Sequence, residues 1–150
     1  MTANDNAAYP SLPRVAVGVV ITHAGKVLLI KRARAPRQGK WALPGGSVKL
    51  GETMQQAAQR EVAEETGVTV LAREPVNCFD VITHDEQGNL QFHYIVADLI
   101  ADYVCGELTP NEEVNGIGWF DPGALDQLDM DPDTLALIRR CLSSTNPRAF

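Results

Sequence analysis

The chain has 150 residues and a formal net charge of −6. With 45% hydrophobic and 21% charged residues, its composition is that of an ordinary globular domain, which excludes a collagen-like repeat, a pure coiled coil and wholesale disorder. The acidic balance argues against a dedicated nucleic-acid or anionic-membrane binder, because such proteins carry a basic surface.

The first part of the chain is predicted to form a β-hairpin. Residues 15–22 are apolar and rich in β-branched side chains, and residues 27–30 continue this pattern after a turn at 23–26. Residues 41–43 form a short extended piece that ends at the loop Pro44-Gly45-Gly46. The hairpin strands are expected to be buried.

A helix is predicted over residues 54–66. Thr53 and Gln56 have the spacing of a capping box at its start, and Gly67 stands where a left-handed C-cap is favoured. The segment between them contains no glycine or proline.

The second half of the chain alternates again between strand and helix patterns. Strands are predicted over residues 76–83, 90–100 and 114–120, and a short helical turn is predicted from Asp121. A final helix follows Asp131, with Pro132 at its first position. Strands in mixed order with helices between and after them predict an α/β sandwich with a sheet covered on both faces.

The cysteines and the apolar runs bear on the compartment. Cys78, Cys105 and Cys141 are odd in number and widely spaced, which argues against a disulfide framework or a zinc site. Residues 1–13 lack the basic region followed by an apolar stretch that is typical of a signal peptide, and no apolar run approaches the roughly 20 residues that cross a bilayer. We therefore expect a cytoplasmic protein in which each cysteine is a small buried apolar side chain.

Three carboxylates fall on one turn of the first predicted helix. Glu61, Glu64 and Glu65 stand at i, i+3 and i+4, where like charges repel by a few tenths of a kcal/mol per pair. Arg60 can reach Glu64, and Glu52 lies favourably at the helix start. A solvated face would accommodate the charges, and so would a hard divalent cation such as Mg²⁺ or Mn²⁺.

The segment from Gly46 to Val68 resembles the signature of the Nudix hydrolases. That signature is Gly, five residues, Glu, seven residues, Arg-Glu, an apolar residue, any residue, Glu-Glu, any residue, Gly and an apolar residue, and every defined position matches. A chance match has a probability on the order of 10⁻⁷. The resemblance implies an αβα sandwich with a mixed β-sheet over residues 14–142, between a flexible segment 1–13 and a tail 143–150.

The resemblance also implies roles for individual residues in the metal-assisted hydrolysis of a pyrophosphate. The carboxylates of Glu61, Glu64 and Glu65, with the backbone carbonyl of Gly45 or Gly46, would hold Mg²⁺ or Mn²⁺. Arg60 would orient the glutamates. The support of the loop would come from Glu52 and Gly51.

Two further features are candidates for the same site. The general base in relatives is either a glutamate of the signature, such as Glu64, or an acidic residue on a later loop, where this chain has Glu112 and Glu113. A basic run over residues 31–40 could meet substrate phosphates or could be a solvated sheet edge. Arg32 and Arg37 are its first candidates for substrate contact.

The segments around the signature most resemble the short bacterial ADP-ribose pyrophosphatases, whose products are AMP and ribose 5-phosphate. Many members of that group have a proline about fifteen residues beyond the signature, where this chain has Ile82-Thr83. The alternative is a nucleoside triphosphate pyrophosphohydrolase that removes oxidised or non-canonical nucleotides and releases pyrophosphate.

A third reading is a nucleotide-sensing Nudix domain without catalysis, which usually has a degraded signature and an appended DNA-binding region. In each of these readings the expected partner is a small nucleotide rather than a nucleic acid or a membrane. Dimers are frequent in the family, so a homodimer is a further expectation.

Overall fold

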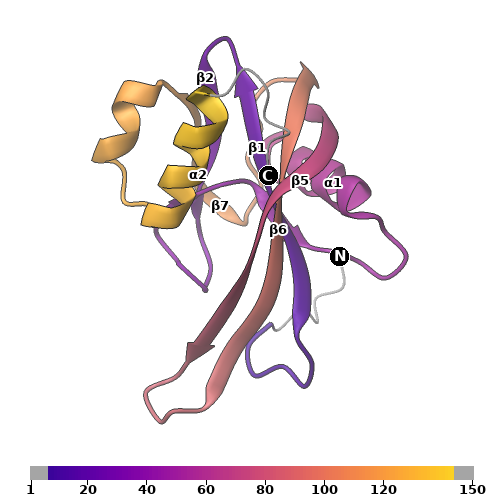
Figure 1. Ribbon diagram of the computed structural model, residues 1–150, viewed down its shortest axis with the longest axis vertical. Coiled ribbons are helices and arrows are strands. Elements are labelled where there is room, and N and C mark those ends of the chain that lie inside the picture. The colour runs from indigo at the N-terminus through magenta and orange to yellow at the C-terminus, as the bar shows by residue number, and fades with distance from the viewer. Residues whose placement is uncertain (1–6, 144–150) are drawn as a thin grey trace.

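The computed structural model describes residues 7–143, which fold into one sheet flanked by helices (Figure 1). The elements in chain order are β1 (Arg14–His23), β2 (Lys26–Arg32), β3 (Trp41–Ala42), β4 (Gly45–Ser47), α1 (Met54–Thr66), β5 (Thr69–His84), β6 (Leu90–Cys105), β7 (Val114–Phe120), the 3₁₀-helix η1 (Pro122–Gln127) and α2 (Pro132–Ser143).

The sheet is mixed, as expected. Its main path runs β3-β2-β1-β6-β5, with β4 paired to the start of β1 and β7 paired to β2. β1 runs parallel to β6, whereas its pairings with β2 and β4 are antiparallel. The long antiparallel hairpin of β5 and β6 projects well beyond the helices (Figure 1).

Side chains that point alternately to the two faces of the sheet form two separate hydrophobic cores. Val17, Val19 and Ile21 of β1 pack on the side that carries Ala58 and Val62 of α1. Between them, Val20 points the other way and packs with α2. Because successive side chains of a strand face opposite sides of a sheet, this pattern places one helix on each face. The predicted α/β, αβα sandwich is confirmed.

The termini of α1 form as the sequence predicts. The Thr53 side chain accepts from the Gln56 backbone N–H at 3.1 Å, and the Gln56 side chain accepts from the Thr53 N–H at 2.8 Å. Gly67 ends the helix with φ of 77°. This capped helix carries the candidate metal-binding glutamates, so its boundaries fix where those side chains leave the backbone.

Two strands are longer than predicted. β5 begins at Thr69 instead of residue 76, and β6 continues to Cys105 instead of stopping at residue 100. Pro75 lies within β5, which is an edge strand whose pairing register shifts on both sides of Pro75. An edge position with a bulge tolerates the missing N–H of proline.

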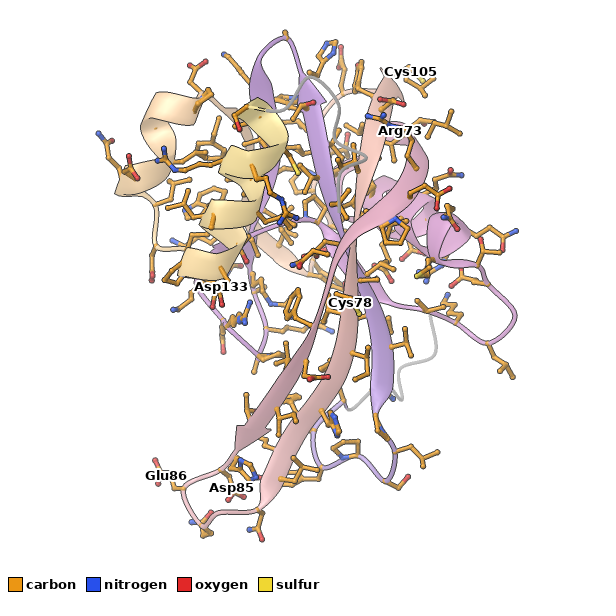
Figure 2. The ribbon with its side chains drawn as sticks, viewed as in Figure 1. Arg73, Cys78, Asp85, Glu86, Cys105 and Asp133 are labelled. Carbon is orange, nitrogen blue, oxygen red and sulfur yellow. The ribbon has the colours of Figure 1, made fainter. Side chains whose placement is uncertain are left out.

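β4 and the cysteines also differ from expectation. Gly45–Ser47 was expected to be loop, yet it pairs with β1 because two glycines allow a close approach of the two backbones. Cys78 and Cys105 are exposed and Cys141 is half-buried, so the expected burial is wrong. Figure 2 shows Cys78 midway along the hairpin of β5 and β6 and Cys105 at the end of the hairpin remote from its turn.

The ends of the chain lie partly outside the described residues. Of the expected flexible segment 1–13, residues 7–13 are described, and the Tyr9 N–H donates to the Gln91 carbonyl at 2.7 Å. Of the expected tail 143–150, the structure describes Ser143, the last residue of α2. Neither helix of the described chain has the length and apolar character needed to cross a bilayer.

Gly25 and Gly67 have the same φ of +77°, so comparing them tests how closely the C-terminus of α1 is packed at Gly67. A Cβ at Gly67 would lie 2.8 Å from the Glu107 carbonyl oxygen, whereas a Cβ at Gly25 would meet nothing within 4 Å. Gly25→Ala should cost about 1 kcal/mol from the left-handed backbone alone. Gly67→Ala should cost about 1–3 kcal/mol more from overpacking, measured by urea unfolding. Equal losses would show that the contact at Gly67 is absent.

Candidate active site

The three glutamates of α1 do not share one environment. Glu61 and Glu65, one turn apart, face the sheet and are 8% and 3% exposed. The side chain of Glu64 is 48% exposed. The helix therefore buries two carboxylates beside β4 and leaves the third at the rim of the same surface.

Arg60 is the centre of an ionic network that joins these carboxylates to the preceding loop. Its Nε and Nη2 donate to the two oxygens of Glu52 at 2.7 and 2.9 Å. Its Nη1 donates to Glu61 at 2.8 Å and to Glu64 at 3.4 Å. A further bond from Nη2 to the Ser47 carbonyl, at 3.0 Å, ties the same guanidinium to β4.

Glu52 is held from both sides. The bidentate Arg60 contact, supported by the Lys49 backbone N–H at 2.8 Å, lowers the pKa of Glu52 to about 2. The loop that carries it turns at Gly51, whose φ of +88° favours glycine. Glu52 thus joins this loop to α1 through Arg60, and the supporting role of Glu52 and Gly51 stays a prediction.

The charged forms of the two buried carboxylates, Glu61 and Glu65, are disfavoured by their surroundings. Burial raises the pKa of Glu65 to about 8, although the Gly45 backbone N–H donates to its Oε1 at 2.8 Å. Burial also raises the pKa of Glu61, against the opposing hydrogen bond from Arg60. The negative charge of Glu61 adds to the rise at Glu65. Such a pair would be stabilised by a positive charge placed between its members.

Gly46 is required beside this pair. A Cβ on Gly46 would lie 2.6 Å from both oxygens of Glu61, so any other residue would displace that carboxylate. β4 therefore brings backbone rather than side chains to the buried carboxylates. The predicted involvement of Gly46 is consistent with this position.

The loop before β7 brings a fourth carboxylate toward the site. Glu113, 32% exposed, raises the pKa values of both Glu61 and Glu65 through its charge. Its backbone carbonyl accepts from the Ala33 N–H at 3.1 Å, and its own N–H donates to the Asn111 side chain at 2.9 Å. Its neighbour Glu112 is exposed. Glu113 is thus the residue of this pair that the fold places near the α1 carboxylates.

The structure separates the two candidate cations of the basic run. Arg32 lies close enough to Glu65 for its charge to lower that pKa, and its Nε donates to the Pro36 carbonyl at 2.7 Å. Arg37 lies instead beside the start of α2, where its Nη2 is 3.4 Å from Asp131. Arg32 therefore faces the α1 carboxylates, and Arg37 faces the other side of the sheet.

The carboxylates present suit a hard cation, although they do not form a closed cage. Within residues 7–143, no group of three or more His, Cys, Asp or Glu side chains is arranged so that it could hold a metal ion. Arg60 and the Gly45 N–H engage the buried oxygens. Mg²⁺ sites commonly use one or two carboxylates and complete their coordination with water and substrate phosphates, so an open carboxylate edge fits that ion.

Sequence reasoning missed one buried acid, Asp98 of β6, which is 4% exposed. The Asn77 side chain donates to its Oδ2 at 3.2 Å, and burial raises its pKa to about 6. A single Asp inside the apolar run Ile95-Val96-Ala97-Asp98-Leu99-Ile100 was the available signal. An acid at such a position is energetically costly unless it is paired.

Comparison with known proteins gives one consistent result. A model of the NUDIX domain matches residues 12–141. The chain is 35% identical to an ADP-ribose pyrophosphatase of Methanocaldococcus jannaschii over 82% of its length and 70% of the relative's. It is 33% identical to the nucleoside triphosphatase NudI of Enterobacter sp., covering 81% of this chain and 91% of that protein.

Solved structures agree with the sequence comparisons. The crystal structure of a MutT protein from Bacillus halodurans superposes with a TM-score of 0.72 at 26% identity, covering 87% of this chain and 83% of the other.

The Arg60–Glu52 contact predicts a defined pH dependence of stability. Because the folded state lowers the pKa of Glu52 from 4.5 to about 2, the contact stabilises the protein fully above pH 4.5 and loses effect as the pH falls toward 2. Glu52→Gln should therefore unfold at a lower temperature than the wild type at pH 6, with a smaller difference at pH 3.5. Glu86→Gln, at the exposed hairpin tip (Figure 2), is the control. A difference that is the same at both pH values would contradict the assignment.

Proposed function

The chain belongs to the NUDIX domain family and is a Nudix hydrolase, and from this premise we propose that it cleaves the pyrophosphate of ADP-ribose to AMP and ribose 5-phosphate. Water adds to one phosphorus, the bridging P–O bond breaks, and the departing phosphate takes up the proton. The observation that carries the proposal is the pair of buried carboxylates, Glu61 and Glu65, beside the exposed carboxylate of Glu64.

Nudix hydrolases generally use divalent metal ions, and we propose Mg²⁺, with Mn²⁺ as a substitute. One or two of the carboxylates of Glu61, Glu64 and Glu65 would hold it, with the Gly46 carbonyl, and water and substrate phosphates would complete its coordination. Bound there, the ion supplies neutralisation of the pyrophosphate and a water of lowered pKa. The raised pKa of Glu65 supports this assignment, because a buried carboxylate gains most from a nearby cation.

The side chains around the carboxylates have separate tasks in this proposal. Arg60 holds Glu61 and Glu64 in position from one side, while Glu52 and Gly51 keep the loop beside them. Glu113 lies on the opposite loop and is the candidate general base, with Glu64 as the alternative within the helix. Arg32 binds a substrate phosphate near Glu65, and Arg37 contacts a more distant part of the substrate.

A nucleoside triphosphate is the alternative to ADP-ribose as the substrate. A relative with 33% identity over nine-tenths of its own length is named a nucleoside triphosphatase, which favours a nucleoside triphosphate that is cleaved with release of pyrophosphate. A non-catalytic nucleotide sensor is disfavoured by the complete signature over Gly46–Val68. We further infer a cytoplasmic enzyme that acts on small nucleotides without nucleic-acid or membrane partners, with a homodimer as the oligomer to test for.

Product identity tests the substrate directly. Incubation with Mg²⁺ and ADP-ribose should yield AMP and ribose 5-phosphate, separated by anion-exchange chromatography. ATP, ITP and oxidised dGTP form the comparison panel, with kcat/KM measured for each. Faster turnover of a triphosphate with release of pyrophosphate would establish the alternative. Absence of turnover on every member with either Mg²⁺ or Mn²⁺ would overturn the enzymatic proposal.

Replacement of single glutamates by glutamine tests the roles proposed for Glu64, Glu65 and Glu113. Glu64→Gln and Glu65→Gln should each lower kcat by about 100-fold or more, since general-base and charge-stabilising groups contribute on this scale. Glu113→Gln should give a graded, smaller loss. Glu74→Gln, on the exposed outer edge of β5, should keep wild-type rates. Near-normal rates in both helix variants, with unchanged circular dichroism, would refute the metal assignment.

A further inference from the structure

The loop between β6 and β7, residues 106–113, is anchored to the rest of the fold at two points. Near its middle, the Thr109 backbone N–H donates at 2.7 Å to the carbonyl of Thr66, the last residue of α1. At its end, the carbonyl of Glu113 accepts from the Ala33 N–H at 3.1 Å. The backbone that carries Glu113 is therefore fixed relative to both α1 and the end of β2.

These backbone anchors do not fix the direction of the Glu113 side chain. Its carboxylate lies near the α1 carboxylates, since its negative charge adds to the burial that raises the pKa of Glu61 and of Glu65. Like charges in such a site repel one another. Because the Glu113 side chain is 32% exposed, it could relieve this repulsion by rotating toward solvent. A neighbouring cation would hold it in place.

Arg34 is the cation beside Glu113. Its Nη1 lies 3.9 Å from Glu113 Oε1, and this is the ion pair that Glu113 forms within residues 7–143. Arg34 stands two residues after the end of β2 and directly follows Ala33, whose N–H holds the Glu113 carbonyl. The antiparallel ladder of β2 and β7 therefore brings both partners of the ion pair to the same end of the two strands.

Other cations of the basic run have different partners. Arg37 and Lys40 pair with carboxylates beside the start of α2, and Arg32 Nε donates to the Pro36 carbonyl. Arg34 thus differs from these three in pairing with the loop before β7. Its side chain is 59% exposed, and exposed ion pairs contribute little to stability. The contact is therefore better suited to orienting a side chain than to holding the fold together.

We propose that Arg34 is a positioning residue that holds the Glu113 carboxylate beside the carboxylates of α1. The inference rests on the proposed function, because it takes Glu113 as the general base of the hydrolysis. A general base works only within hydrogen-bond reach of the proton that it removes. Loss of Arg34 lets the Glu113 side chain turn away, so it slows the chemical step and leaves substrate binding unchanged.

Kinetics of Arg34 variants test the positioning role. Arg34→Gln should lower kcat about 3- to 10-fold, no more than Glu113→Gln does, with KM within about twofold of the wild type. Arg34→Lys should recover most of the rate, because it keeps the charge. In a Glu113→Gln background, Arg34→Gln should cause no further loss. Arg139→Gln, which removes an exposed arginine paired with Asp126 on the α2 side, is the control and should keep the wild-type kcat.

Three kinetic results would contradict the positioning role. A raised KM with unchanged kcat would show that Arg34 contacts the substrate instead. An equal loss of kcat from Arg34→Gln with and without Glu113 would show that it acts independently of that carboxylate. An Arg34→Gln variant with the same kcat as Arg139→Gln would show that the ion pair has no effect on the reaction.

A measurement without turnover separates this test from that of the hydrolysis. In protein labelled with ¹³C at the glutamate carboxyl carbons, the NMR signal of Glu113 is the one missing from Glu113→Gln. Arg34→Gln should shift this signal, and Arg139→Gln should leave it in place. An unshifted signal in Arg34→Gln would overturn the ion pair. A shifted signal in a protein whose wild type turns over no substrate would reject the hydrolysis, and the positioning role with it, while retaining the contact.

Discussion

The Arg60 guanidinium is the interaction on which the candidate site depends. It binds Glu52 with two nitrogens, reaches Glu61 and Glu64, and donates to the Ser47 carbonyl. One cation therefore compensates carboxylates that would otherwise repel one another on a single helical turn. The same side chain joins the helix, the preceding loop and β4, so the electrostatics and the geometry of the site have a common origin.

Close approach of backbones gives the site its second constraint. β4 can lie against β1 and the buried carboxylates because Gly45 and Gly46 carry no side chain there. The Gly45 N–H is consequently free to hold Glu65, and the next strand pair, Gly18 with Asp98, has room for a carboxylate inside the sheet. Glycines thus shape both the candidate site beside α1 and the position of Asp98 on the α2 side of the sheet.

Much of the site could be predicted from sequence because it is local. The spacing of Glu61, Glu64 and Glu65 follows from the helical repeat, and the capping box and Gly67 set the limits of that helix. Features that depend on contacts between distant segments of the chain were not predicted. The pairing of β4 and the extension of β5 through Pro75 depend on which strand lies alongside, and the exposure of Cys78 depends on a hairpin that projects from the body.

By itself, the sequence determined the capped helix, the order along the chain of every strand except β4, and the three carboxylates on one turn, since each depends on residues close together in the chain. Tertiary structure alone decided that Glu65 is buried while Glu64 is exposed, that Glu113 rather than Glu112 faces them, and that Asp98 stands opposite Gly18. Burial and charge proximity depend on distances across the sheet, which no spacing along one chain segment specifies.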